Sequence, residues 1–181
     1  MSERIRPDTP TGPIVVGVDG SRFSRSALRW AITEGRRTSS LVVALMSWRA
    51  DPVTGVGRPV VAGLPTHPHQ SPETRFQQFL DDTVREVVAD VGGPEPIARV
   101  TPGSAAQNLV DASAEASLLV LGSHGHGRLF TAVVGSVAEY CVRNAVCPVV
   151  IIPAPVAEAA DEPVLVPTAL LSDAYGLGTL L

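Results

Sequence analysis

Lysine is absent from this chain, and aromatic residues and cysteines are scarce. All 14 basic residues are arginines, aromatic residues make up 4% of the sequence, and there are two cysteines. A phosphate-binding loop that depends on a lysine is therefore excluded. Two cysteines are too few for a disulfide framework, so we expect Cys141 and Cys147 to be buried free thiols.

Long apolar runs and a strong net charge are missing as well. No run approaches the ~20 apolar residues of a membrane-spanning helix, and residues 1–11 are polar, without the apolar centre of a signal peptide. The formal net charge is −4, which does not favour binding to nucleic acid or to an anionic membrane. We therefore expect a cytoplasmic protein whose partners include neither.

Short apolar runs typical of strands alternate with segments of helical periodicity along the middle of the chain. With 45% apolar residues and few aromatics, the core must consist of Val, Leu, Ile and Ala, which suits a buried parallel sheet. The pattern predicts strands at 13–18, 41–48, 96–101, 118–121 and 148–153. It predicts helices at 24–37, 73–90, 107–115 and 136–145, with Ser24 and Ser104 as caps. This alternation indicates an α/β fold with a five-stranded parallel sheet and right-handed crossovers.

The segments outside this pattern are rich in proline or glycine. We expect residues 1–12 to be a flexible tail, 13–153 to be one nucleotide-binding domain and 154–181 to be a linker or tail of unknown role. Residues 50–72 are predicted as a loop. Residues 162–166 are the one part of the C-terminal segment with the character of an extra strand.

A glycine-rich stretch joins the fourth predicted strand to the fourth predicted helix. It runs from Gly122 to Arg128 and is followed, after an apolar turn, by Gly135 and Ser136. Glycines let the backbone approach a ligand, and free N–H groups at a helix start point toward an anion. The stretch therefore predicts a site for a nucleotide or another phosphorylated molecule. The alternative is a strand-to-helix turn in which glycine serves geometry alone.

Polar residues also follow the first and second predicted strands. In open parallel sheets ligands bind beyond the carboxyl ends of the strands, where the strand order reverses, so Asp19 is expected to face the same crevice as the glycine stretch. Asp19 could accept a hydrogen bond from an adenine amino group or a ribose, or it could be an ordinary turn residue. Ser47 could offer backbone groups to adenine, or it could be an ordinary strand residue.

Histidine pairs occur at His67 and His69 and at His124 and His126. A zinc site needs three or four ligands in closed geometry, so we interpret all four as exposed loop residues and predict no metal site. His124 or His126 could contact phosphate when protonated. No catalytic constellation is visible, so no catalytic residue is predicted.

The spacing of Gly122, Gly125 and Gly135-Ser136 resembles the nucleotide motif of the universal stress protein family, in its ATP-binding branch. The segments 14–21, 103–110 and 147–153 are similar to that family's first strand, third-helix entry and closing strand. The resemblance covers residues 13–153. It implies a Rossmann-like or flavodoxin-like doubly wound sheet with helices on both faces, which binds ATP and usually dimerises.

The resemblance also implies the residues of the site and the role of the protein. The expected binding residues are Gly17, Asp19, Ser47, Gly122, Ser123, His124, Gly125, His126, Gly127, Arg128, Gly135, Ser136 and Val137. We expect a nucleotide-dependent regulatory module of the stress response that binds ATP, optionally with Mg²⁺, and forms a homodimer through the last strand; its protein partner is not indicated. The alternatives are a slow ATP hydrolase or adenylate-using enzyme of related fold, and a structural interaction protein with an unused loop.

Overall fold

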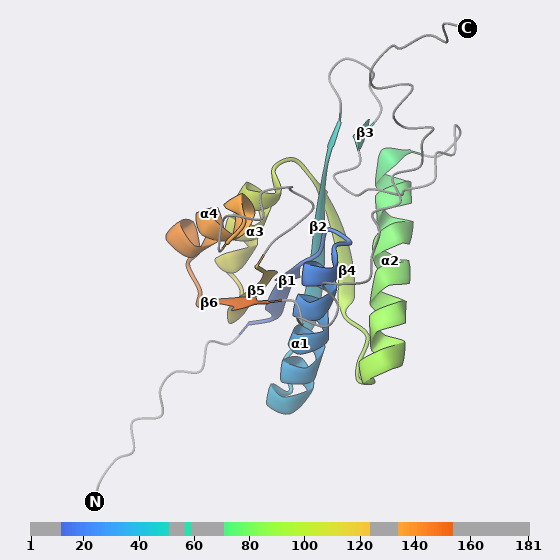
Figure 1. Cartoon of the computed structure of the whole chain (residues 1–181), viewed down its shortest axis with the longest axis vertical. Helices are drawn as coiled ribbons and strands as arrows, with labels where there is room; N and C mark the ends of the chain where they lie inside the picture. Colours follow the sequence, from blue (N-terminus) through green and yellow to red (C-terminus); the bar gives the residue numbers. More distant parts are fainter. Residues whose placement is uncertain (1–11, 51–56, 59–70, 124–133, 154–181) are drawn as a thin grey trace, which may run out of the picture.

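The computed structural model describes residues 12–50, 57–58, 71–123 and 134–153. Strands and helices alternate along them, as predicted (Figure 1). The strands are β1 (Ile14–Gly17), β2 (Val42–Ala50), β3 (Gly57–Arg58), β4 (Ile97–Pro102), β5 (Leu118–Gly122) and β6 (Val149–Ile152). The helices are α1 (Arg22–Thr38), α2 (Pro72–Val91), α3 (Ala105–Ser113) and α4 (Ser136–Asn144).

Five of the strands form one parallel sheet in the order β4-β2-β1-β5-β6, which confirms the predicted architecture. A further strand, β3, pairs antiparallel with the end of β2, so that Arg49 lies opposite Arg58 in the ladder. This strand lies inside the stretch 50–72, which we predicted as a loop. Two residues are too few to show the alternation by which a strand is recognised in a sequence.

Helices cover both faces of the sheet (Figure 1). Val16 points into the core cluster on the side of α1 and α2, together with Leu28 and Phe76. Its neighbour Val15 points the other way, into the cluster that contains Leu109 of α3. Successive residues of a strand face opposite sides, so each strand contributes to both layers. The predicted doubly wound arrangement is confirmed.

The N-cap of α1 lies three residues before the predicted one. Ser21, not Ser24, is the N-cap: its side chain accepts a hydrogen bond from the Ser24 N–H at 3.2 Å. The Ser24 hydroxyl donates back to the Ser21 carbonyl at 3.0 Å. Both serines are buried. The bond to the Ser21 side chain satisfies the Ser24 N–H, one of the donors that a helix start leaves unpaired. Ser104 is the N-cap of α3, as predicted, but its side chain makes no capping bond.

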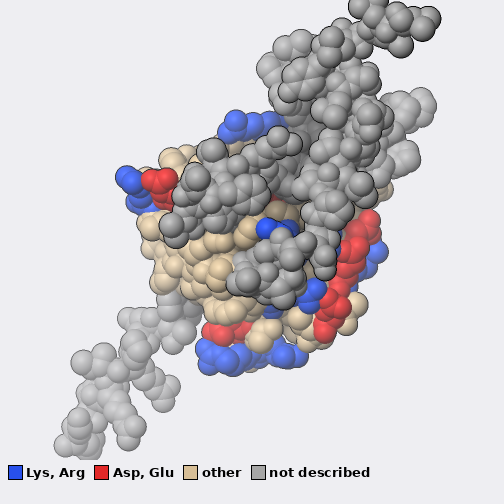
Figure 2. All heavy atoms as spheres, in the orientation of Figure 1, with Lys and Arg blue, Asp and Glu red and all other residues tan. Residues whose placement is uncertain are grey.

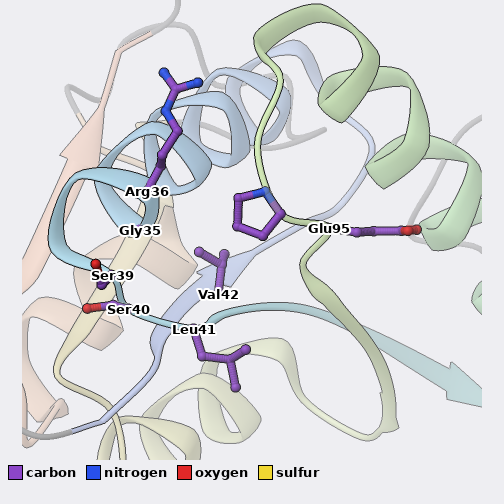
Figure 3. Close-up of a pocket in the computed structure, with 8 residues that line it drawn as sticks. Gly35, Arg36, Ser39, Ser40, Leu41, Val42 and Glu95 are labelled. Atoms are coloured by element: carbon purple, nitrogen blue, oxygen red, sulfur yellow. The ribbon is translucent and has the colours of Figure 1, made fainter.

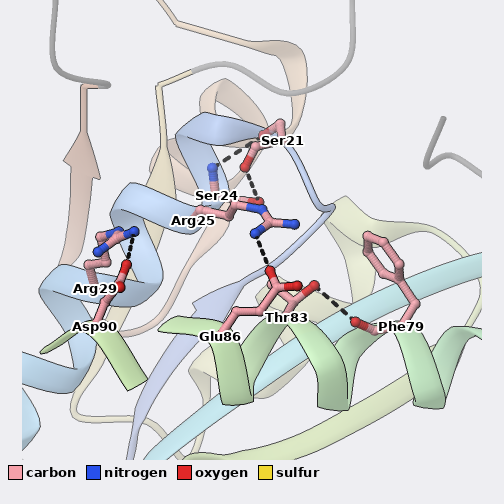
Figure 4. A network of polar contacts seen from close by, with 8 residues as sticks. All are labelled: Ser21, Ser24, Arg25, Arg29, Phe79, Thr83, Glu86 and Asp90. Carbon is pink, nitrogen blue, oxygen red and sulfur yellow. Dashed lines mark hydrogen bonds and ion pairs between the residues drawn. The ribbon is translucent and has the colours of Figure 1, made fainter. Parts of the chain in front are cut away.

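Two ion pairs join α1 to α2, which run side by side in the same direction (Figure 4). Arg25 Nη1 lies 2.6 Å from Glu86 Oε2, and Arg29 pairs with Asp90 one turn further along both helices. α1 begins 3 residues before Arg25, whereas α2 begins 14 residues before Glu86. The amino-terminal end of α2 therefore extends about 16 Å beyond that of α1.

Both cysteines are free thiols, which confirms that prediction. Cys141 is fully buried, whereas Cys147 is half-buried rather than buried as expected. Burial raises the pKa of the Cys141 thiol to about 11. None of the helices in the described ranges is both long and apolar enough to cross a membrane.

Candidate functional site

The reversal of strand order lies between β1 and β5. β1 pairs with β2 on one side and with β5 on the other, with Val16 opposite Val120. The turn that leaves β1 and the segment that leaves β5 are therefore neighbours at the carboxyl end of the sheet. Open parallel sheets bind ligands at this position. The structure thus brings together the two segments that the sequence analysis paired.

Asp19 organises the turn between β1 and α1. Its Oδ1 accepts a hydrogen bond from the Ser21 N–H at 3.0 Å, and its own N–H donates to the Ser24 hydroxyl at 3.3 Å. Gly20, between them, has a φ of 82°, which favours glycine. Asp19 therefore has the turn role that was the alternative for it. A contact from Asp19 to adenine or ribose stays a prediction.

Gly122 is needed for packing. It is the last residue of β5, and a Cβ built on it would lie 2.7 Å from the carbonyl carbon of Phe23 in α1. Its contact with a ligand stays a prediction. Gly17, at the end of β1, faces a side chain instead of a backbone: its Cβ would lie 2.8 Å from the Cδ2 methyl of Leu121. Phe23 was missed because nothing in a sequence marks a backbone that lies against a glycine.

Two backbone hydrogen bonds fix the segments on either side of residues 124–133. The Gly135 N–H donates to the Ser123 carbonyl at 2.8 Å, and the Ser123 N–H donates to the Ile152 carbonyl at 2.9 Å. The two arms of the glycine stretch are thus held together and joined to β6. The end of β5 and the start of α4 have a fixed relation to each other at the carboxyl end of the sheet.

The amino-terminal end of α4 begins with a glycine as its N-cap, and this residue offers the backbone donors no side chain. Its N-cap is Gly135, with φ −69° and ψ 157° and no side-chain capping bond. The first helical bond runs from the Glu139 N–H to the Gly135 carbonyl at 2.9 Å. The N–H groups of the first turn, including those of Ser136 and Val137, precede that bond and have no partner within the helix. Together with the helix dipole they form an environment that favours an anion.

Several predicted site residues fall outside the described ranges: His124, Gly125, His126, Gly127 and Arg128, and also His67 and His69. Their roles stay predictions. Across the ranges that the structure does describe, no three His, Cys, Asp or Glu side chains come together in a way that could hold a metal ion.

Ser47 is held by a residue that the sequence analysis did not single out. Asn108 of α3 donates from Nδ2 to the Ser47 hydroxyl at 3.0 Å and to the Pro102 carbonyl at 3.1 Å. Asn108 thereby joins the ends of β2 and β4 to α3. An asparagine in the first turns of a helix is a common sequence feature, so nothing distinguished it beforehand.

A pocket of about 480 Å³ opens at the other end of the sheet (Figure 3). Gly35, Arg36 and the following residues 39–42 line it from the end of α1 and the start of β2, and Pro94 and Glu95 close it. This is the amino end of the strands, about 17 Å along β2 from Ser47. It does not include any residue of the predicted nucleotide site, so we assign it no part in that site.

The sequence is similar to that of known proteins. The model of the universal stress protein family matches residues 11–153. The chain belongs to this family. Universal stress protein Rv2623 of Mycobacterium tuberculosis is 30% identical over 147 residues, which cover 77% of this chain and 46% of that protein. The chain thus spans about half the length of the curated relatives it matches.

Solved structures of the family share the fold. Universal stress protein UspA from Lactobacillus plantarum superposes with a TM-score of 0.59 at 21% identity, covering 78% of this chain and 97% of that one. A universal stress protein in complex with cAMP gives 0.57 at 19% identity, with coverages of 80% and 98%. A family member from Arabidopsis thaliana with AMP bound gives 0.54 at 17% identity, with coverages of 84% and 98%. At these identities the likeness establishes the fold.

Proposed function

We propose that this universal stress protein binds ATP at the carboxyl ends of β1 and β5 and acts as a nucleotide-dependent regulatory module of the stress response. One observation carries the proposal: the amino-terminal end of α4, whose N-cap is a glycine, is held against the end of β5, at the point where the strand order reverses. Anions bind such helix starts through free N–H groups. Family members of the same fold that carry AMP and cAMP support the choice of an adenine nucleotide.

In this proposal, different residues of the site bind the phosphates and the adenosine. The first-turn N–H groups of α4 and the Ser136 hydroxyl receive phosphate oxygens, with Gly125, Gly127 and Arg128 completing the phosphate contacts. Asp19 and the end of β2 at Ser47 face the adenosine. If Mg²⁺ accompanies ATP, phosphate oxygens are its expected ligands, since Mg²⁺ is commonly held through substrate phosphates.

The test separates nucleotide binding from folding with the substitution Ser136→Asp. An acidic residue in the first turn of a helix stabilises the helix, but its charge repels phosphate. We therefore expect an unchanged or higher melting temperature together with a loss of ATP affinity in calorimetry of at least about tenfold. Thr33→Glu adds the same charge on the exposed side of α1, between Arg29 and Arg37, and serves as the control that keeps ATP affinity.

A direct measurement precedes the variants. Mass spectrometry of the purified protein under native conditions should reveal an adenine nucleotide carried through purification or added afterwards. If ATP binds neither the parent nor any variant in calorimetry, the proposal fails. If Ser136→Asp binds ATP as tightly as the parent, the phosphates do not lie at α4.

We also propose a homodimer that forms through β6. This strand is at an edge of the sheet, and its only strand partner in the described part of the chain is β5. All four of its residues are half-buried and apolar. An open edge of this kind favours pairing with another strand.

A further inference from the structure

Two side-chain nitrogens in the described part of the chain are buried without a hydrogen-bond partner: Arg75 Nε and Trp48 Nε1. Arg75 as a whole has an exposed fraction of only 9%. A buried donor is costly unless an acceptor accompanies it. The structure therefore contains two buried N–H donors without an acceptor, and one of them belongs to a positively charged side chain.

Arg75 lies on the side of α2 that faces α1. The positions 75, 79, 83, 86 and 90 form one stripe along the helix, because they are spaced by three or four residues. Glu86 and Asp90 of this stripe bind arginines of α1, and Figure 4 shows Phe79 and Thr83 continuing it toward the start of α2. Arg75 is the next position. α2 extends beyond α1 at this end, toward the carboxyl end of the sheet (Figure 1). Arg75 is the fourth residue of α2 and therefore lies past the start of α1.

Trp48 reaches the same region from β2. Its ring stacks on the ring of Phe76, with centroids 6.1 Å apart and planes inclined by 17°. Phe76 follows Arg75 in the first turns of α2 and belongs to the same core cluster as the partly buried Trp48. The two unpaired nitrogens thus lie where the start of α2 meets the end of β2.

The described residues offer Arg75 no counter-charge. Glu73, in the same helical turn, is exposed, and Asp81 accepts a hydrogen bond from Gln77. Acidic side chains are exposed along α2 (Figure 2). Glu86 and Asp90 pair with arginines of α1, and their side chains have exposed fractions of 61% and 54%. The sequence from Pro52 to Gln70 contains no acidic residue.

We propose that Arg75 and Trp48 form a subsite for a phosphate group. Both groups are N–H donors and neither can accept, so the ligand must supply acceptors. A guanidinium matches a phosphate in charge and in the geometry of paired hydrogen bonds. The start of α2 adds a positive potential at the same place, and the region is at the end of the sheet where parallel α/β proteins bind ligands.

The first experiment uses inorganic phosphate as the probe and the full chain as the protein. Melting temperatures are measured in phosphate, chloride and acetate at equal ionic strength and pH. We expect phosphate to raise the melting temperature of the parent by several degrees over chloride and acetate, since a ligand that binds the folded state stabilises it. An equal rise in acetate, or no rise in phosphate, overturns the proposal.

Variants show whether Arg75 receives the phosphate. Arg75→Met should lose the phosphate-dependent rise and, in chloride, should melt at or above the temperature of the parent, because a buried donor without an acceptor is gone. Arg85→Met removes the same charge from the same helix at an exposed position paired with Asp82, and it should keep the rise. Trp48→Phe keeps an aromatic ring but lacks the N–H, and it should reduce the rise. If the phosphate-dependent rise persists in both Arg75→Met and Trp48→Phe, the subsite is contradicted. If Arg75→Met does not fold, the size of the rise in Trp48→Phe decides whether the subsite exists.

A last comparison identifies the source of the phosphate. If the group belongs to a nucleotide, Arg75→Met should weaken AMP binding by about tenfold or more and leave adenosine binding unchanged. If AMP and adenosine bind Arg75→Met as they bind the parent while the phosphate-dependent rise is lost, the subsite takes free phosphate or another phosphoryl compound. Because inorganic phosphate is the primary probe, the subsite can be confirmed even if the chain fails to bind ATP, and it can fail while ATP binding succeeds.

Discussion

Gly122 and Phe23 are in contact through their backbones: a Cβ on Gly122 would lie 2.7 Å from the Phe23 carbonyl carbon and 2.8 Å from its carbonyl oxygen. The contact joins the end of β5 to the first turn of α1 at the candidate nucleotide site. Any side chain at position 122 would push α1 away from the sheet. A substitution there consequently changes the fold before it changes a ligand contact.

The first prediction concerns the energetic cost of this contact. Gly122→Ala should lower the free energy of unfolding by roughly 1–3 kcal/mol, the usual cost of overpacking a rigid region. Gly17→Ala is the matched control, because its new methyl would meet the side-chain ends of Leu121 and Leu109, which can move. We expect a smaller loss for it, about 1 kcal/mol or less. Urea unfolding of both variants measures the difference, and equal losses would show that the Phe23 backbone yields as readily as a leucine side chain.

The sheet and its helices were predictable because their signals are repeated along many residues. The apolar runs at 118–121 and 148–153 and the helical pattern at 73–90 each contain several residues that agree with one another. The parallel sheet with right-handed crossovers followed from the alternation of strands and helices. The meeting of the β1 and β5 turns followed from the rule that ligands bind at the reversal of strand order.

The details that were missed depend on single contacts between distant residues. Ser24 has the right chemistry for a cap, and only the geometry of the turn at Asp19 selects Ser21 instead. The burial of Arg75 could not be foreseen, because an arginine in the first turn of a helix is usually exposed.

A second prediction follows from the raised pKa of Cys141. Its ordinary value is 9.0, and burial raises the pKa to about 11 in the folded protein. Below pH 9 the thiol is protonated in both states and its contribution to stability is fully present. As the pH rises from 9 to 11 the unfolded thiol ionises first, so the folded state should lose up to roughly 3 kcal/mol. Denaturant unfolding across this pH range measures the loss.

The variant Cys141→Ala tests the assignment of this alkaline loss. It should be less stable at pH 8, because a buried sulfur is removed, yet its stability should fall less between pH 9 and 11 than that of the parent. Cys147→Ala is the control: burial raises the pKa of Cys147 as well, but this thiol is only half-buried. If both variants follow the parent profile, the alkaline loss arises elsewhere.

The third prediction concerns self-association through β6. Val150 pairs with Val120 in the sheet and is half-buried, and it does not belong to either core cluster. Val150→Lys should therefore leave the monomer folded and weaken the dimer, because charged residues on an edge strand oppose edge-to-edge pairing. Sedimentation velocity at micromolar concentration measures the change. Leu41→Lys, at a position with an exposed fraction of 55% at the amino end of the sheet, is the control that should stay dimeric; a parent that sediments as a monomer contradicts the dimer itself.

The fourth prediction is that residues 155–181 are dispensable for folding and for nucleotide binding. Within the described residues, the parallel sheet has its last strand at Val149–Ile152, and both core clusters are formed from residues that precede position 153. The segment 155–181 contains three prolines and four acidic residues, a composition that contributes little to a core. A chain truncated after Ala154 should therefore keep the melting temperature and the ATP affinity of the parent.

The alternative is that Val164 to Leu171 packs on the domain. In that case truncation should lower the melting temperature by several degrees, since burying even a few apolar side chains has an effect of that size. Truncation after Pro163 distinguishes a contact made by residues 164–181 from one made by residues 155–163, because only the first would be lost in both truncated chains.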